Sequence, residues 1–355
     1  MGSHEKYLYN SLKIIWLVTI VSLCELIVPF GVFILPIFLL HTIIRYVAPL
    51  VNPKYGKVLS GMSSVAASDD LYDRPLYNVL LYYFVDGFID VDQHRELFLD
   101  KVVNAKHEDG KLKYPELRMH ISKFCGFSIW KEEEIFDIKD HIRLYDTELF
   151  KLKNGEKLDE HAVVTAANDI LIMPFEKERS PWEIMLFHGA CTKLCASKNQ
   201  SLIVFRYHHA LSDGYSITKL MAQVTTGDYF PSPIMKQSQW KRVLEILTFP
   251  FTGMFVAVAY LHRYMDNNAW NFKVNFKASK VRNMHYSCSD CIPVSQIKEV
   301  KNKMGGSFNG VILAAIAGGI RQHFVVNGAH LPHAMHVGLS FPVPGHPDQK
   351  LTNHW

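Results

Sequence analysis

Residues 201–224 read SLIVFRYHHALSDGYSITKLMAQV and contain a strand, a tight turn and a helix in direct succession. The first seven residues, SLIVFRY, are mostly apolar, which is typical of a short buried strand. Asp213 and Gly214 then form a turn, and Ser216 is placed to cap a helix. After Ser216 the apolar residues recur at helical spacing, which predicts one buried helix face: Ile217, Leu220, Met221 and Val224. A strand of a sheet therefore leads directly into an amphipathic helix.

Two adjacent histidines, His208 and His209, end the predicted strand. Successive side chains of a strand point to opposite faces, so only one of the two can reach a given substrate. We predict His209, because it is the last residue before the turn, where a side chain can project into a cleft. A neutral imidazole, with an ordinary pKa near ~6.5, can take a proton from a hydroxyl group that attacks a carbonyl. The alternative is a pair of packed histidines beside an ordinary turn.

The turn residues have simpler interpretations. Asp213 follows His209 by four residues and could orient it, as the acid of a Ser-His-Asp arrangement does. An aspartate in an Asp-Gly turn more often bonds backbone amides or an arginine, so we favour a structural role. Gly214 would supply a positive φ or leave room for a ligand chain close to the backbone.

The rest of the chain alternates strand and helix patterns, which indicates a mixed α/β fold. Strands are predicted at 75–85, 183–187 and 336–343, and helices at 90–103, 297–304 and 308–326. A length of 355 residues allows two ordinary domains. The net charge of +4 is spread along the chain without a long basic run, so a nucleic-acid partner is not expected.

Metal sites are not favoured by the cysteine and histidine spacing. Cys288 and Cys291 form a CxxC pair, but a structural zinc site would need a second ligand pair, so we interpret them as partly buried thiols. A solvated loop is the simplest interpretation of three histidines with a proline between them, His330, His333 and His336.

An apolar segment at residues 14–44 contains one acidic residue and no basic one, and exceeds the ~20 residues that span a bilayer. Pro29 and Gly31 divide it into halves of ~22 to 24 Å, at about 1.5 Å per helical residue. Each half is shorter than the ~30 Å hydrocarbon layer, which favours a hairpin in one leaflet with both ends in the cytosol. The alternative is one long, tilted and kinked span.

A second apolar stretch, Val243–Leu261, is interrupted by Glu245, Pro250 and Gly253, so we interpret it as interfacial or packed against protein. These segments suggest four parts of the chain. They are a membrane anchor at 1–60, a first lobe at 61–240, an apolar connection at 241–275 and a partial second lobe at 276–355.

The stretch YHHALSDGYS has the HHxxxDG pattern of acyltransferases with the chloramphenicol acetyltransferase-like fold. These include nonribosomal peptide condensation domains and the wax ester synthase/diacylglycerol O-acyltransferase family. The flanking sequence resembles the second group. The matching segments run in order along the chain: PLYNVLLYYFVDG at 75–87, YPELRMHIS at 114–122, SIWKEEEIFDIKDHI at 128–142, PFEKERSPWEIMLFHG at 174–189 and GGSFNGVILAAIAGGIRQHF at 305–324.

This resemblance implies a two-lobed α/β fold in which the second lobe is incomplete and a membrane hairpin precedes the first. Carried over by position, His209 is the general base, and His208 and Asp213 complete the catalytic motif. Gly214 and Asn309 would contribute to substrate binding. Gly310 departs from the family, which has Asp at this position.

The implied activity is transfer of a fatty acyl group from acyl-CoA to a long-chain alcohol or diacylglycerol, with no cofactor, metal or acyl-enzyme. The expected location is the endoplasmic reticulum or lipid-droplet surface, with the catalytic part in the cytosol. Two alternatives stay open: a non-catalytic relative that binds lipid or acyl-CoA, and a condensation-type enzyme acting on a carrier protein. Because the sequence stops at LTNHW, early in the second lobe, a shortened or inactive relative is also considered.

Overall fold

The structure is a computed structural model, and it divides into two compact units. Unit 1 comprises Met1–Arg242, Met284–Ser287 and Ser340–Trp355, and unit 2 comprises Val243–Asn283 and Cys288–Leu339. The predicted strand at 336–343 and most of the two apolar segments fall outside the described residues. Those residues are 16–17, 19–21, 36–37, 39–73, 75–152, 156–192, 200–225, 238–241, 243–244, 248, 286–287, 292–331, 346 and 350–353.

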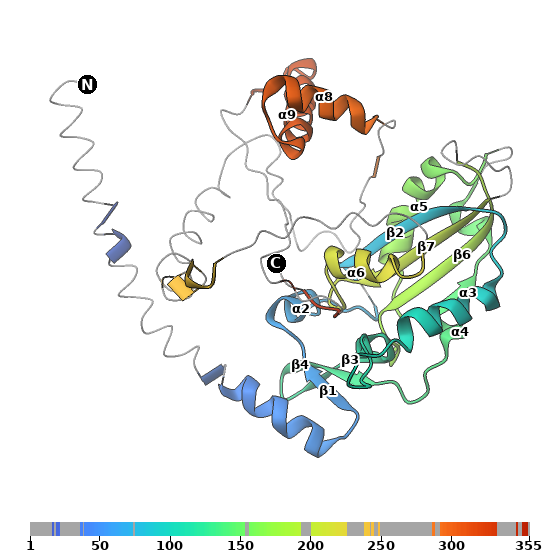
Figure 1. Ribbon diagram of the computed structural model, residues 1–355, viewed down its shortest axis with the longest axis vertical. Coiled ribbons are helices and arrows are strands. Elements are labelled where there is room, and N and C mark those ends of the chain that lie inside the picture. Colours follow the sequence, from blue (N-terminus) through green and yellow to red (C-terminus); the bar gives the residue numbers. More distant parts are fainter. Residues whose placement is uncertain are drawn as a thin grey trace. The chain divides into compact units, whose positions relative to one another are not determined.

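The larger sheet of unit 1 has the strand order β2-β7-β6-β5 (Figure 1). β2 (Asn78–Asp86) and β6 (Trp182–Ala190) run antiparallel to β7 (Gln200–His208), and β5 (Ile142–Leu144) runs parallel to β6. All nine residues of β7 are buried, because both of its edges are paired and both of its faces are covered. The apolar run SLIVFRY therefore forms a central strand, as predicted.

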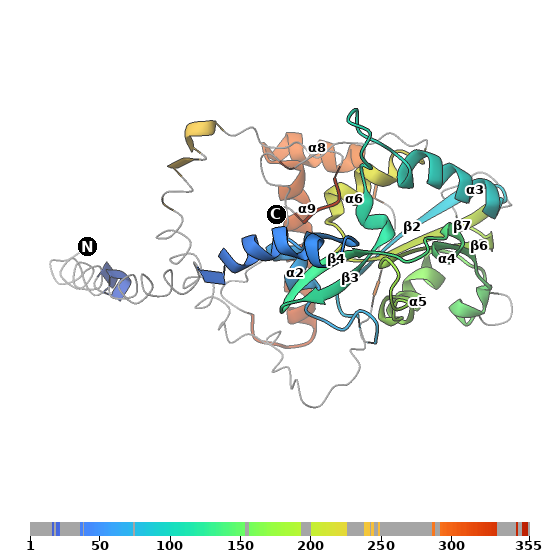
Figure 2. The same ribbon diagram turned by 90° about the horizontal axis from the view of Figure 1, so that it is seen from below.

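Helices cover both faces of this sheet (Figures 1 and 2). On one face lie α3 (Val91–Phe98), which continues as η1 (Leu99–Val103), and α6 (Gly214–Met221). Their apolar residues share a core with alternate residues of β7: Phe98, Val102, Ile217, Leu220, Ile203, Phe205 and Tyr207. α5 (Glu160–Ile172) covers the other face and packs on Leu202 and Val204.

The start of α6 differs from the sequence prediction. Asp213, and not Ser216, is the N-cap: its backbone is extended, and its Oδ1 accepts the Ser216 backbone N–H at 3.0 Å. Ser216 is already inside the first helical turn, where its side chain is buried. Gly214 begins the helix and is not among the residues with positive φ, so the predicted positive φ is wrong. A backbone that enters a helix directly from its cap has no need of the left-handed region.

A smaller sheet has the order β1-β4-β3, formed by Tyr55–Val58, Phe127–Glu132 and Met119–Phe124. The helix Leu39–Val51 packs on it through Ile44 and Ala48, which are buried against Ile129 of β4. Most other apolar residues of this helix are exposed: Leu39, Leu40, Ile43, Tyr46, Val47, Leu50 and Val51. One face of the helix therefore belongs to the protein core, and its remaining surface is mostly apolar, with Thr42 and Arg45 also exposed.

Short elements complete unit 1, and two helices make up the described part of unit 2. The short elements are α2 (Gly61–Ala66), η2 (Pro115–Arg118), α4 (Ile138–His141) and η3 (Thr147–Phe150). Unit 2 contains α8 (Val294–Met304) and α9 (Phe308–Val326), which confirms the two predicted helices. Among the helices that the structure describes, α9 alone is long and apolar enough to cross a membrane, a criterion that core helices of soluble proteins also meet.

Candidate active site

His209 lies one residue beyond the end of β7, at the mouth of the turn. Its backbone N–H donates to the Tyr77 carbonyl at 2.8 Å, which ties this residue to the chain just before β2. Its side chain is partly exposed, whereas Tyr207, His208 and Ala210 are buried. The ring is therefore held at a fixed position while keeping some contact with solvent.

His208 is fully buried and has both ring nitrogens engaged. Its Nε2 lies 3.1 and 3.2 Å from the two carboxylate oxygens of Asp69, and its Nδ1 accepts the Ala210 backbone N–H at 3.2 Å. A nitrogen that accepts a hydrogen bond carries no proton, so His208 is neutral with its proton on Nε2. Both ring nitrogens of His208 are therefore bonded to groups of the protein itself.

Asp69 joins three parts of unit 1. Besides meeting His208, its Oδ2 accepts the backbone N–H groups of Leu76, at 2.6 Å, and Tyr77, at 3.2 Å. Burial by itself would raise the pKa of Asp69, but the hydrogen bond from His208 and those from these two amides lower it below its ordinary value. The carboxylate therefore stabilises the chain entry to β2, beside the end of β7.

Asp69→Asn is expected to reduce the free energy of unfolding by about 1 to 3 kcal/mol at pH 7, because a buried, charge-assisted contact is lost. The folded pKa of Asp69 is lowered, so its stabilisation is fully present above the unfolded pKa of about 3.9 and is lost as the pH falls through the folded value. The difference between variant and parent should therefore shrink on acidification, as followed by urea unfolding at several pH values. Asp70→Asn, at an exposed neighbour, is the matched control. An equal effect of both changes at pH 7 would contradict this role for Asp69.

The carboxylate of Asp213 contacts the start of α6 and His346. Its Oδ1 caps α6, and its Oδ2 lies 2.9 Å from Nε2 of His346, whose ring packs against Tyr215 at 4.4 Å between centroids. The Asp213 backbone N–H donates to the carbonyl of Thr352 at 3.1 Å. Asp213 thus connects the turn to residues near the end of the sequence.

Gly214 and Asn309 lie in different units. A Cβ placed on Gly214 would meet no atom within 4 Å, so the space beside this backbone is open. Asn309 is an exposed residue in the first turn of α9. The next residue, Gly310, donates its backbone N–H to Ser307 Oγ at 3.0 Å, and a Cβ there would come within 3.0 Å of that oxygen. Glycine therefore fits this tight cap.

Asn353 contacts the candidate base directly. Its Oδ1 lies 3.0 Å from His209 Nδ1, and its Nδ2 donates to the His209 carbonyl at 2.7 Å and to Ser63 Oγ at 2.9 Å. Sequence reasoning missed Asn353, His346 and Asp69. The available signal was weak: Asp69 is one of two adjacent aspartates, and Asn353 is one polar residue in LTNHW.

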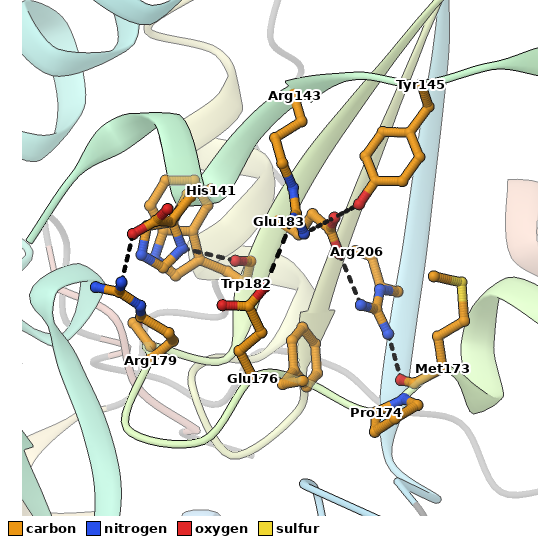
Figure 3. Close-up of a pocket in the computed structure, with 13 residues that line it drawn as sticks. His141, Arg143, Tyr145, Met173, Pro174, Glu176, Arg179, Trp182, Glu183 and Arg206 are labelled. Atoms are coloured by element: carbon orange, nitrogen blue, oxygen red, sulfur yellow. Dashed lines mark hydrogen bonds and ion pairs between the residues drawn. The ribbon is translucent and has the colours of Figure 1, made fainter.

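A cavity of about 120 Å³ lies beside the β5–β6–β7 strands (Figure 3). Its central feature is Glu183, whose carboxylate receives Arg143 and Arg206 at 2.7 Å each and also bonds the Tyr145 hydroxyl. Burial by itself would raise the pKa of Glu183, but the charge of Arg206, the bond from Tyr145 and the charge of Arg143 hold it below its ordinary value. The charged groups of this cavity are therefore paired with one another.

Within the described ranges, no group of three or more His, Cys, Asp or Glu side chains could hold a metal ion. The predicted thiol pair at Cys288 and Cys291 lies outside those ranges, as do His333 and His336. Cys125 and Cys191 are free thiols.

The fold and these contacts define an α/β protein with two histidines at the end of a central strand, one locked in the interior and one partly open to solvent. Residues 91–245 match the family described as "Wax ester synthase/diacylglycerol acyltransferase catalytic domain". This segment of the chain is therefore similar to that family. No curated protein matches the chain in a sequence comparison.

Several solved structures are similar to this chain. A "Wax ester synthase/diacylglycerol acyltransferase from Marinobacter aquaeolei VT8" is 14% identical with a TM-score of 0.44, and the match covers 78% of this chain and 62% of that one. The first condensation domain of the CDA synthetase is 13% identical with a TM-score of 0.35, covering 48% and 37%. Polyketide synthase associated protein 5 from Mycobacterium tuberculosis is 19% identical with a TM-score of 0.27, covering 51% and 36%. The chain thus spans less than two thirds of the Marinobacter protein.

Proposed function

We propose that this chain is a membrane-associated O-acyltransferase that moves a fatty acyl group from acyl-CoA to a long-chain alcohol or diacylglycerol, with His209 as general base. The match of residues 91–245 to the wax ester synthase/diacylglycerol acyltransferase catalytic domain supports the reaction class. The single observation that supports the base is the contrast between the two histidines. His208 has both nitrogens bound inside the protein, whereas the His209 ring is partly exposed.

The proposed reaction has one displacement at the thioester. The acceptor hydroxyl oxygen attacks the acyl carbonyl carbon while His209 removes the hydroxyl proton, and the carbon–sulfur bond then breaks. The coenzyme A thiolate leaves and takes up the proton held by the imidazole, so the products are an ester and free coenzyme A. General-base assistance of this kind contributes about 10²- to 10⁴-fold to a rate. The proposal needs neither a metal nor a cofactor.

Membrane association is supported by the apolar residues of Leu39–Val51 that remain exposed after the helix has packed on the small sheet. Exposed apolar surface on a helix next to a long apolar segment is suited to the lipid interface. We propose that segment 14–44 enters one leaflet as a hairpin, at the endoplasmic reticulum or a lipid-droplet surface, with the catalytic part in the cytosol. Gly214 and Asn309 are proposed to contact the substrates.

The test is an acyl-transfer assay in membranes that contain the full chain, with radiolabelled long-chain acyl-CoA and with hexadecanol and diacylglycerol offered together. We expect labelled wax ester or triacylglycerol well above that of membranes lacking the chain. A chain that binds acyl-CoA but forms neither ester would contradict the proposal and favour a lipid-binding relative. Formation of the same products after removal of all acyl-CoA would contradict the proposed donor.

A further inference from the structure

The carboxamide of Asn353 joins three segments that are far apart in sequence. Asn353 is 5% exposed, and its side chain reaches Ser63 on α2, the His209 backbone and the His209 ring. The contacts to His209 cross 144 residues of sequence. A buried polar side chain can form hydrogen bonds only with its immediate neighbours, so its bonding pattern constrains the groups around it.

The direction of each bond follows from which groups can donate. The His209 backbone carbonyl can only accept, so the Asn353 atom 2.7 Å from it must be the amide nitrogen. The second proton of this NH₂ group points to Ser63 Oγ at 2.9 Å. The carboxamide oxygen therefore faces Nδ1 of His209 at 3.0 Å, and this oxygen can only accept. Nδ1 must then carry a proton.

We infer that Asn353 is a positioning residue that holds neutral His209 in the tautomer with its proton on Nδ1 and its lone pair on Nε2. The neighbouring His208 is held in the opposite tautomer, because its Nδ1 accepts from the Ala210 amide. The inference rests on the proposed function in one respect: Nε2 is then the atom that takes the acceptor's proton. The same bond also fixes the plane of the ring, as the buried acid does in a catalytic triad.

An amide and a carboxylate would act differently in this position. The neutral amide orients the ring without adding a negative charge beside the imidazolium that forms during proton transfer. A carboxylate at the same place would favour the charged form of the ring. Substituting Asn353 by aspartate therefore separates orientation from charge.

The tautomer can be measured by ¹⁵N spectroscopy on the full chain in lipid nanodiscs with ¹⁵N-labelled histidine. His209→Gln identifies the His209 signals by their loss. At neutral pH we expect a protonated Nδ1 and an unprotonated Nε2 in the parent, and loss of this preference in Asn353→Leu. Ser63→Ala, which removes one contact of the carboxamide without touching the ring, should preserve it. A proton on Nε2 in the parent, or an unchanged tautomer in folded Asn353→Leu, would overturn the inference.

The kinetic readout separates positioning from general packing. Asn353→Leu should lower kcat about tenfold or more with KM for acyl-CoA nearly unchanged, since a wrong tautomer impairs the proton transfer itself. In Asn353→Asp the acidic limb of the pH–rate profile should move to higher pH by about one unit or more. The positioning role would be overturned if Ser63→Ala and Asn353→Leu lost kcat equally and the acidic limb of the pH–rate profile did not shift in Asn353→Asp. The spectra require no turnover, so they remain decisive even for a parent chain that makes no ester.

Discussion

His209→Gln is expected to reduce ester formation by about 10²- to 10⁴-fold, the usual contribution of a general base. Glutamine keeps a polar group of similar reach, but it cannot take up the proton that the acceptor hydroxyl must lose. The measurement is the initial rate of radiolabelled ester formation from acyl-CoA in membranes, normalised to the amount of protein. Membrane association should be the same as in the parent, because His209 lies at the end of β7 and not on the apolar helix Leu39–Val51.

His161→Gln is a matched control. His161 is an exposed residue of α5, which covers the face of the sheet opposite α6. It should retain the parent rate. Equal rates in His209→Gln and the parent would remove the general-base assignment. A similar loss in His161→Gln would show that the loss reflects general damage to the protein.

Arg206→Met is expected to lower the free energy of unfolding by about 3 to 5 kcal/mol, the usual effect of removing one partner of a buried ion pair. The side chains of Arg206 and Glu183 are 2% and 5% exposed, and they meet at 2.7 Å (Figure 3). Methionine fills a similar volume, but it leaves the buried negative charge of Glu183 with one positive partner fewer. Arg143 and Tyr145 still contact that carboxylate, so the lower end of the range is expected. Chemical unfolding followed by tryptophan fluorescence measures the difference.

The exposed pair Lys151–Asp169 provides a control of similar geometry. Its atoms also meet at 2.7 Å, but the side chains are 78% and 48% exposed. Lys151→Met should change the free energy of unfolding by no more than about 1 kcal/mol, because water screens such a pair. Equal effects of Lys151→Met and Arg206→Met would contradict the view that burial sets the contribution of the Glu183 network. Adding Glu183→Leu to Arg206→Met should recover part of the loss, because the unpaired charge is then removed as well.

The local pattern of apolar residues predicted β7, α6 and α9. The run SLIVFRY became β7, and the spacing of Ile217 and Leu220 placed α6 against the sheet. The bounds of α9 agree with the predicted helix at 308–326. In each case one apolar stretch, either continuous or at helical spacing, indicates the element before its tertiary partners are known.

Side-chain partners that are distant in sequence could not be predicted in the same way. His208 meets Asp69 across 139 residues, and His209 meets Asn353 across 144. A lone Asp or Asn in a polar segment does not indicate which strand end it will reach, because this depends on the packed positions of several elements. The N-cap of α6 also could not be predicted from the sequence. Asp213 and Ser216 are both good N-cap residues, and only the backbone conformation separates them.

Hydropathy also could not assign the faces of the helix Leu39–Val51, which begins inside segment 14–44. Ile44 and Ala48 lie in the protein core, while Ile43 and Val47 are exposed on the same helix. All four residues are apolar, so the sequence alone gives no contrast between a surface that meets protein and one that meets lipid.

The bridge from Ser63 to His209 through Asn353 also bears on the order of events during synthesis. His209 is translated 144 residues before the side chain that fixes its ring. At about 5 to 20 residues per second, about 7 to 30 seconds separate the two on the ribosome. The nascent sheet can pair β2, β6 and β7 in that interval, because all three strands precede His209. The imidazole gains its final orientation last, when the late segment docks on a scaffold that has already folded.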